Sequence, residues 1–156
     1  MAKLKIVKVG DEVLRKKSRP VEVITPKTIQ LLDDMAETMR QAQGVGLAAP
    51  QVGVLRRIVV IEVEEGNLIE LINPKIIAYA GEQDGTEGCL SVPGKWGMVK
   101  RPMHVTVRAI NRYGEEFEIN GSELLARALC HELDHLDGKL YIDVARNIET
   151  VPQDAE

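Results

Sequence analysis

The spacing of hydrophobic residues along the chain changes twice, from a helical period to a strand-like period and back. Thr25 and Pro26 suit the start of a helix, because a hydroxyl can cap the first turn and proline needs no hydrogen bond there. Apolar residues then recur at helical spacing up to about Gln43, at Ile29, Leu32, Met35, Ala36 and Met39. The pattern predicts a helix with one buried face. It ends before the glycine-rich segment 44–51, which we expect to be irregular.

From Arg57 onward, short runs rich in β-branched residues replace this period. We expect strands over residues 58–63, 68–72, 75–79, 103–110 and 116–119. Turn residues separate the runs, namely Glu65-Gly66-Asn67, Asn73-Pro74 and Asn111-Arg112-Tyr113-Gly114. Because the strands form one block with short connections, neighbouring strands are predicted to be antiparallel.

A second helix is expected from about Ser122 to Gly138, with Glu123 in its first turn. One face of this helix is predicted to be both buried and functional, with Leu124, Ala128, His131 and His135 on it. The order helix, strands, helix predicts an α+β domain, in which antiparallel sheets pack around a central C-terminal helix and the N-terminal helix lies outside. The polar tail 144–156 is expected to fray.

The motif His131-Glu132-Leu133-Asp134-His135 carries the clearest chemical signal. Residues four apart share a helix face, so both histidines can bind one metal ion while Glu132 points at its open coordination position. The same pattern also occurs by chance on surface helices that bind no metal. Here the histidine face continues an apolar stripe, and burying two imidazoles without partners is unfavourable. The motif therefore predicts a site for metal-assisted hydrolysis.

Two imidazoles leave a catalytic metal one protein ligand short. The thiol of Cys89, between Gly88 and Leu90, is the strongest candidate, although a cysteine of this kind is often only a small buried hydrophobe. Cys130 lies about 100° around the helix from the adjacent histidine, so we expect it to pack in the core. His104 has no partner nearby in the sequence and is expected to be an exposed strand residue, not a ligand.

Composition limits the remaining possibilities. The 156 residues, 44% hydrophobic and 28% charged, fit one globular catalytic domain over residues 1–156. A net charge of -4 and scattered basic residues argue against direct binding of nucleic acid. The first eight residues lack the apolar core of a signal peptide, and no apolar run is long enough to span a membrane. We therefore expect a cytoplasmic protein without a membrane partner, in which a Cys89–Cys130 disulfide would be disfavoured.

Three segments together resemble the signature motifs of the peptide deformylases, in the same order and with similar spacing. They are Gly44-Val45-Gly46-Leu47-Ala48-Ala49-Pro50-Gln51, Glu87-Gly88-Cys89-Leu90-Ser91 and His131-Glu132-Leu133-Asp134-His135. The resemblance extends from about Val9 to Asp143, and the three motifs in combination are highly specific. Since no long insertion separates the first two motifs, the chain is most similar to the short bacterial type.

The resemblance implies that Cys89, His131 and His135 hold the metal, with a water as the fourth ligand. Glu132 is then expected to accept a proton from that water and to deliver it to the leaving amine. Gln51 matches the residue whose side-chain amide donates to the oxyanion together with a backbone N–H, here that of Leu90. A loop cap is the alternative role for Gln51.

The resemblance also implies a place for the substrate. An extended peptide is expected to pair with the segment Gly44-Val45-Gly46 as an added strand, because the two glycines allow close approach of the backbone. Val45 and Leu90 are candidates for the wall of the methionine pocket. Glu87 is counted among the substrate-binding residues, and it is also expected to form an ion pair with Arg101 beside the site.

The function implied is removal of the N-formyl group from the first methionine of nascent polypeptides, with release of formate. The partner is then the N-formylmethionyl end of the nascent chain, and a transient contact with the ribosome is left open. Ferrous iron is the expected metal in the cell, and Zn(II), Ni(II) or Co(II) also suit one thiolate and two imidazoles. One departure is Cys130, which stands where the family usually has glutamine and affects hydrogen bonding behind the site and sensitivity to oxidation.

Two alternatives remain at this point. An ordinary H-E-x-x-H zinc metallopeptidase usually takes its third ligand from beyond the motif, and little sequence follows it here. A structural metal site would need a fourth protein ligand, for which only Cys130 or His104 is available.

Overall fold

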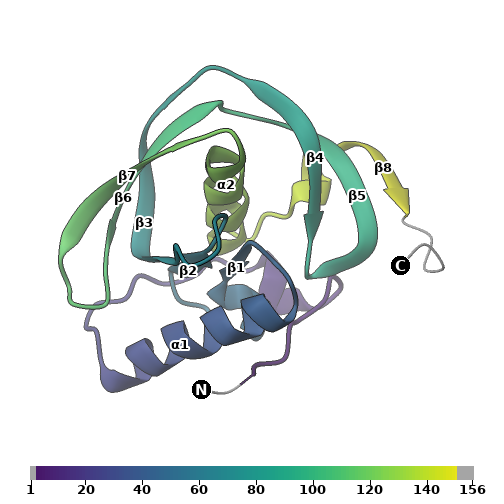
Figure 1. Ribbon diagram of the computed structural model, residues 1–156. Helices are drawn as coiled ribbons and strands as arrows, with labels where there is room; N and C mark the ends of the chain where they lie inside the picture. Colours follow the sequence, from purple (N-terminus) through teal and green to yellow (C-terminus); the bar gives the residue numbers. More distant parts are fainter. Residues whose placement is uncertain (1–2, 151–156) are drawn as a thin grey trace.

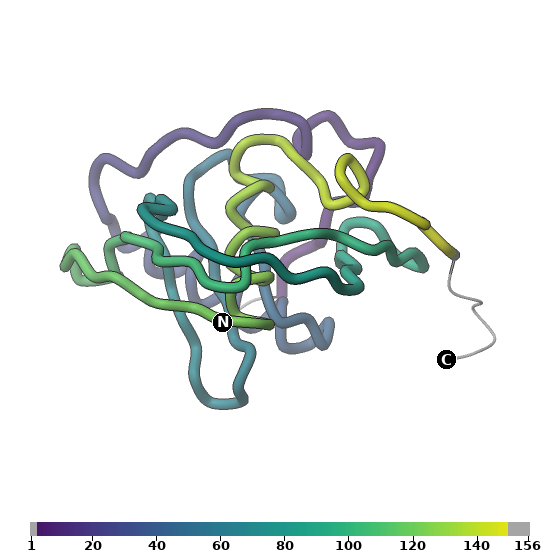
Figure 2. Tube along the Cα trace, turned by 90° about the horizontal axis from the view of Figure 1, so that it is seen from above, coloured from purple at the N-terminus to yellow at the C-terminus, as the bar shows by residue number. Residues whose placement is uncertain are grey.

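The structure is a computed structural model that describes residues 3–150. Its elements are, in chain order, η1 (Glu12–Arg15), α1 (Pro26–Gln41), β1 (Gly46–Ala48), η2 (Ala49–Val52), β2 (Ile58–Ile61), β3 (Ile69–Ala80), β4 (Gln83–Cys89), β5 (Val92–Arg101), β6 (His104–Ile110), β7 (Glu116–Ser122), α2 (Leu124–Leu136), η3 (Tyr141–Asp143) and β8 (Arg146–Thr150). Neighbouring strands pair antiparallel in two sheets, one in the order β1-β2-β3-β6-β7 and one in the order β4-β5-β8. Figure 1 shows α2 in the middle of the strands and α1 outside them. The view from above in Figure 2 again shows α2, in yellow-green, near the middle of the molecule. The predicted α+β architecture is confirmed.

Strand β2 belongs to two hydrophobic cores at once. Its four residues, Ile58–Ile61, are all buried. Because strand side chains alternate between faces, Val59 and Ile61 join the core under α2, whereas Ile58 and Val60 join the core under α1. The uninterrupted apolar run in the sequence reflects this burial on both faces.

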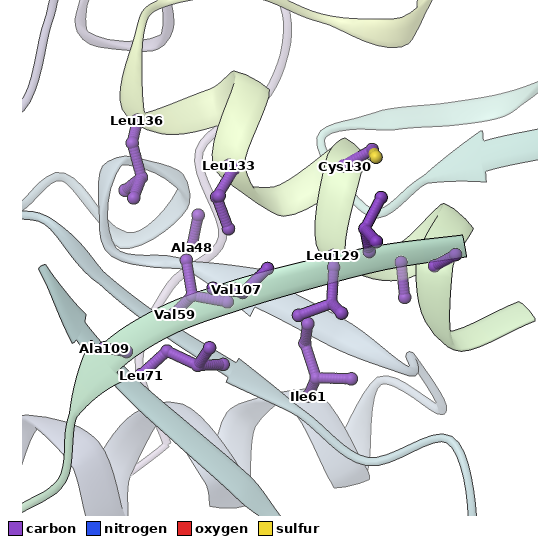
Figure 3. Close-up of a cluster of buried hydrophobic side chains, with 13 residues drawn as sticks. Ala48, Val59, Ile61, Leu71, Val107, Ala109, Leu129, Cys130, Leu133 and Leu136 are labelled. Atoms are coloured by element: carbon purple, nitrogen blue, oxygen red, sulfur yellow. The ribbon is translucent and has the colours of Figure 1, made fainter. Parts of the chain in front are cut away.

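The first of these cores fixes the position of α2. Figure 3 shows the side chains of Leu129, Leu133 and Leu136 on α2 next to those of the five-stranded sheet. The sheet supplies Ala48, Val59, Ile61, Leu71, Val105, Val107 and Ala109. Because the helix also contacts β5 and η2, it is surrounded on most sides, and ten of its thirteen residues are buried.

Helix α1 begins as the sequence predicts. The hydroxyl of Thr25 accepts a hydrogen bond from the N–H of Thr28, and Pro26 occupies the first turn. Leu32, Met35 and Met39 lie on its buried face, at the spacing of successive helical turns. The helix ends at Gln41, two residues earlier than expected.

The predicted turn at Asn73-Pro74 is wrong, because β3 runs through these residues as one strand. A register shift against β6 between Ile72 and Lys75 absorbs the proline as a bulge, and Asn73 adopts a positive φ of 54°. The side chain of Asn73 is held by both backbone groups of Val21, donating at 2.9 Å and accepting at 2.8 Å. The bulge thus replaces the turn that the Asn-Pro pair suggested.

Four of the strands, β1, β4, β5 and β8, were not predicted. β4 is rich in glycine and polar residues and β5 is interrupted by glycine, so neither shows the alternation that marks a strand. β1 lies within the segment 44–51 that was expected to be irregular. The expected fraying of the tail is also wrong for Arg146–Thr150, which form β8 and pair with β5. Residues 151–156 lie outside the described part of the chain.

The ends of α2 differ from the prediction by a few residues. Ser122 belongs to β7, and Glu123 precedes the helix with a positive φ of 55° and no side-chain cap. At the other end, Gly138 has a φ of 75° and its N–H bonds to the carbonyl of His135. The predicted glycine stop is confirmed. Within residues 3–150, neither α-helix is long and apolar enough to span a lipid bilayer.

We predict that Gly138→Ala destabilises the protein more than Gly66→Ala. Both glycines have positive φ, so alanine costs about 1 kcal/mol at either site from backbone strain. At Gly138 the new Cβ would also lie 2.6 Å from the carbonyl carbon of Arg15, whereas at Gly66 it would meet nothing within 4 Å. Urea unfolding should show a loss of about 3 kcal/mol for Gly138→Ala, and equal losses for the two variants would contradict this reading of the helix end.

Candidate metal centre and substrate cleft

Three side chains bring possible metal donors together beside α2. The thiol of Cys89 and the imidazoles of His131 and His135 have donor atoms that all lie within 4.8 Å of one another. Sγ of Cys89 is 3.3 Å from Nε2 of His135. One thiolate and two imidazoles form a donor set that suits Zn(II), Fe(II), Co(II) or Ni(II). The residues present therefore fit a metal ion.

The backbone of two elements explains this convergence. His131 and His135 lie one turn apart on α2, with ring centroids 5.1 Å apart. Cys89 is the last residue of β4, and the pairing of β4 with β5 shifts register between Glu87 and Cys89. Such a bulge bends the strand and changes the direction of the following side chain. The helix period and the strand bulge together aim the three donors at one point.

A buried carboxylate behind the donors fixes the orientation of His131. Oε1 of Glu87 is 2.8 Å from Nδ1 of His131, so Nδ1–H donates and Nε2 is the nitrogen that remains for a metal ion. Burial raises the pKa of Glu87, but hydrogen bonds from Arg101 and His131 outweigh it and lower that pKa to about 2. Burial also lowers the pKa of His135 to about 3, so its imidazole is neutral. Burial also acts to lower the pKa of His131, but Glu132, Cys89 and Glu87 outweigh it and raise that pKa well above its usual value. Since a histidine binds a metal in its neutral form, metal binding at His131 would release a proton.

The predicted ion pair between Glu87 and Arg101 is confirmed. Nε and Nη2 of Arg101 donate to the two oxygens of Glu87 at 2.8 and 2.9 Å. Nη1 of Arg127 donates to the same carboxylate at 2.8 Å, and Nη1 of Arg101 reaches Asp134 at 2.8 Å. Both oxygens of Glu87 thus have partners already. Glu87 therefore orients His131 from behind, and its contact with substrate stays a prediction.

Glu132 lies between the two histidines in sequence and is also buried. Its Oε1 has no hydrogen-bond partner among the described residues. Burial raises the pKa of Glu132 to about 7, against the effect of the neighbouring charge of His131. Gly46 on β1 approaches this carboxylate so closely that a Cβ there would lie 2.6 Å from Oε2. The glycine is thus needed for contact with Glu132, a reason that the sequence did not reveal.

The side chain of Gln51 is held with its amide group toward Cys89. Its Oε1 accepts from the backbone N–H of Ala48 at 3.0 Å, which fixes the orientation of the carboxamide. Nε2 donates to Oγ of Ser91 at 3.1 Å and lies 3.6 Å from Sγ of Cys89. Gln51 is therefore a fixed donor beside the three-donor cluster. It also closes its own loop through the bond from Ala48, as the alternative role predicted, whereas its contact with an oxyanion stays a prediction.

A cavity of about 560 Å³ opens next to these residues. All the residues expected to contact substrate line it, namely Gly44, Val45, Gly46, Glu87 and Leu90, together with Gln51, Cys89, His131 and Glu132. Leu124 and Ala128 of α2 also line it. Leu124 is half exposed, which corrects the expectation that it shares a buried face with the histidines. Its side chain is accessible because it borders the cavity.

Sequence reasoning missed two residues of the site. Arg127 is buried and reaches the carbonyl oxygens of Gly85 and Val99 in addition to Glu87. A signal existed, because Arg127 lies four residues before His131 and therefore on the same helix face. Tyr141, fully buried in η3, stacks on the ring of His131 with centroids 5.9 Å apart. No sequence pattern marked Tyr141.

Cys130 and His104 do not belong to the three-donor cluster. Cys130 is buried in the core under α2, as predicted, and burial raises the pKa of its thiol to about 11. Both cysteines are free, so the disulfide is absent as expected. His104 is exposed on β6, where its Nδ1 lies 2.8 Å from the hydroxyl of Ser122.

Comparison with known proteins decides the family. The sequence matches the family model described as polypeptide deformylase over residues 3–151. The chain belongs to the peptide deformylases. Peptide deformylases are metalloenzymes that remove the N-formyl group from nascent polypeptides, so neither the metallopeptidase nor the structural-site alternative is favoured.

Individual peptide deformylases resemble this chain over most of its length. The enzyme of Thermoanaerobacter pseudethanolicus is 61% identical over 138 residues, which are 88% of this chain and 86% of that protein. The crystal structure of a peptide deformylase from Legionella pneumophila matches with a TM-score of 0.91 and 46% identity, covering 94% of this chain and 88% of that chain. The Thermotoga maritima structure matches with a TM-score of 0.90 and 36% identity, covering 94% and 99%.

We predict that Gly46→Ala lowers kcat about 100-fold while the metal content stays unchanged. The added methyl group would push against Oε2 of Glu132, which the sequence predicts to be the proton acceptor, and displacement of such a group by about 1 Å costs this much. Gly44→Ala is the matched variant, because its Cβ would meet only the flexible end of Leu90, at 2.7 Å. Its loss should be smaller. Steady-state kinetics with metal analysis checks both variants, and equal losses would show that contact with Glu132 is not the reason for glycine.

Proposed function

We propose that this chain deformylates N-formylmethionyl peptides with Cys89, His131 and His135 as the ligands of one divalent metal ion. The observation that carries the proposal is the convergence of one thiol and two imidazoles within 4.8 Å beside an open cavity. Three protein ligands leave one coordination position free, as a catalytic site needs. When bound, the cation supplies Lewis-acid chemistry, which polarises the formyl carbonyl and makes water a stronger acid.

Glu132 is proposed as the group that moves the proton. Its carboxylate follows His131 directly on α2 and faces the cavity, with Oε1 free of any partner among residues 3–150. A free carboxylate oxygen can take a proton from the attacking water and then transfer it to the nitrogen of the leaving amine. The close packing of Gly46 supports this role, because it limits the positions open to the carboxylate.

Gln51 and Leu90 are proposed to stabilise the negative charge that forms on the formyl oxygen. Nε2 of Gln51 is fixed by its contacts with Ser91 and Cys89, and the backbone N–H of Leu90 follows Cys89 directly. Fixed donors aimed at developing charge each lower a barrier by about 3 kcal/mol. A neutral amide is suited to this task because it donates without adding a charge that would repel the metal.

The peptide is proposed to bind along β1 as an added strand. β1 is an edge of the five-stranded sheet, with β2 on one side only. The segment Gly44-Val45-Gly46 borders the cavity, so its free backbone groups can pair with an extended substrate. Val45 and Leu90 are proposed as apolar walls for the methionine side chain, and the half-exposed Leu124 adds a third.

The metal in the cell is proposed to be Fe(II), and Zn(II), Ni(II) or Co(II) can replace it. The donor set supports all four, because thiolate and imidazole are ligands that each of them accepts.

The proposed substrate also indicates where in the cell the protein works. Since formylated chains are made on ribosomes, we propose a cytoplasmic location and a transient contact with the ribosome. We also propose that residues 1–156 form one catalytic domain.

An assay with two peptides tests the proposed function. Formyl-Met-Ala-Ser should release formate, whereas an unformylated internal peptide should remain intact. Cleavage of the internal peptide without release of formate from the first would reject the proposal and favour the metallopeptidase alternative.

We predict that Glu132→Gln lowers kcat about 1000-fold and leaves the metal bound. The amide keeps the shape of the side chain but accepts no proton, and loss of a general base has an effect of this order. Glu116→Gln is the control, because it makes the same change at an exposed position on β7. Metal analysis and formate release should be measured on the same preparations. An unchanged rate in Glu132→Gln would instead indicate a structural metal.

We predict that chelation abolishes activity and that Fe(II) restores it best under anaerobic conditions. The apoprotein should be titrated with Fe(II), Zn(II), Ni(II) and Co(II), with metal content and formate release measured after each addition. Iron should also be present after anaerobic purification. Iron-free protein with full activity would contradict the assignment of the metal.

A further inference from the structure

The cavity beside the metal centre carries one charged side chain that is open to solvent. Of its charged lining residues, Glu87, Arg127 and Glu132 are all buried. Lys8 is exposed. Nζ of Lys8 donates to the backbone carbonyl of Leu90 at 3.2 Å, and the part of the chain that the structure describes offers it no acidic partner. An uncompensated positive charge therefore stands at the mouth of the cavity.

The backbone around Lys8 is fixed to both walls of the cavity. The N–H of Val7 donates to the carbonyl of Gln51, and the N–H of Val9 donates to the carbonyl of Ser91, each at 2.7 Å. Gln51 follows β1 closely, and Ser91 follows Cys89 closely, so the segment 7–9 crosses from one wall to the other. Lys8 thus presents its charge from a defined place, although its side chain is exposed.

The path of the substrate leads toward this charge. Gly46 lies against Glu132, and Gly44 lies against Leu90, whose carbonyl holds Lys8. A peptide whose formyl end is near Glu132 and whose backbone pairs antiparallel with β1 runs from Gly46 toward Gly44. Two residues of an extended strand span about 7 Å. The first or second residue after methionine therefore passes Leu90 and comes within reach of Nζ.

We propose that Lys8 is a specificity residue that favours substrates with an acidic side chain in the first two residues after methionine. The inference rests on the proposed function and deepens it, because it names the class of peptide that this site prefers. A carboxylate on the substrate would pair with Nζ at the cavity mouth. Exposed pairs of this kind contribute modestly and are weakened by salt, so the preference is about fivefold at low ionic strength.

The test compares formyl-Met peptides that differ only by Asp or Asn at the second or third residue, with an amide at the C-terminus. The wild-type ratio of kcat/KM, Asp over Asn, should be about five in 20 mM salt and about one in 0.5 M salt. Lys8→Gln should bring the ratio to about one at low salt, and Lys8→Glu should invert it. Lys75→Gln, a change of an exposed lysine on β3 outside the cavity, should keep the wild-type ratio.

A wild-type ratio of one at low salt, or a ratio that Lys8→Gln leaves unchanged, overturns the proposal. Either result is compatible with deformylase activity, so it leaves the proposed function intact. Absence of formate release from both peptides would overturn the proposed function and this inference with it.

Discussion

The buried carboxylate of Glu87 is the interaction on which the site depends, because it joins the elements that carry the functional side chains. It lies on β4, two residues before Cys89, and bonds to His131 on α2 and to Arg101 on β5. A buried charge without partners is strongly unfavourable, so this carboxylate is stable only while all three elements are in place. The same contacts that orient His131 therefore also set the distance between the helix and the three-stranded sheet. Arg127 completes the neutralisation from α2 itself.

The fold was predictable where burial leaves a periodic signal in the sequence. The helical spacing around Met35 predicted α1 correctly, and the apolar run 58–63 predicted β2. β4 could not be found in this way, because its glycines and polar residues show no alternation, and its strand conformation comes from pairing with β5. The prediction of a turn at Asn73-Pro74 was wrong for a related reason. The local preference for a turn was outweighed by pairing on both sides of a bulge, together with the two bonds to Val21.

The candidate site was also predictable only where a feature depends on local sequence. The spacing of His131 and His135 on one helix is a local property, so the sequence alone places them together. That Cys89 lies within 4.8 Å of them depends on a bulge in β4. Donor chemistry made its thiol the strongest candidate for the third ligand, and the resemblance between motifs supported that choice, but no local pattern places it beside the helix. Contacts between residues far apart in the chain leave no pattern in the sequence, so the stacking of Tyr141 on the ring of His131 was not predicted. Arg127 was accessible to reasoning, since a charge on the buried face of a helix requires a buried partner.

The burial of β2 on both faces determines how the protein unfolds. Val59 and Ile61 face one core, and Ile58 and Val60 face the other, so the strand cannot leave one layer without exposing the second. Neither hydrophobic core can therefore unfold while the other stays intact. Amide protons of residues 58–61 should therefore exchange with solvent only when the whole chain unfolds, and they mark the slowest-exchanging part of the enzyme.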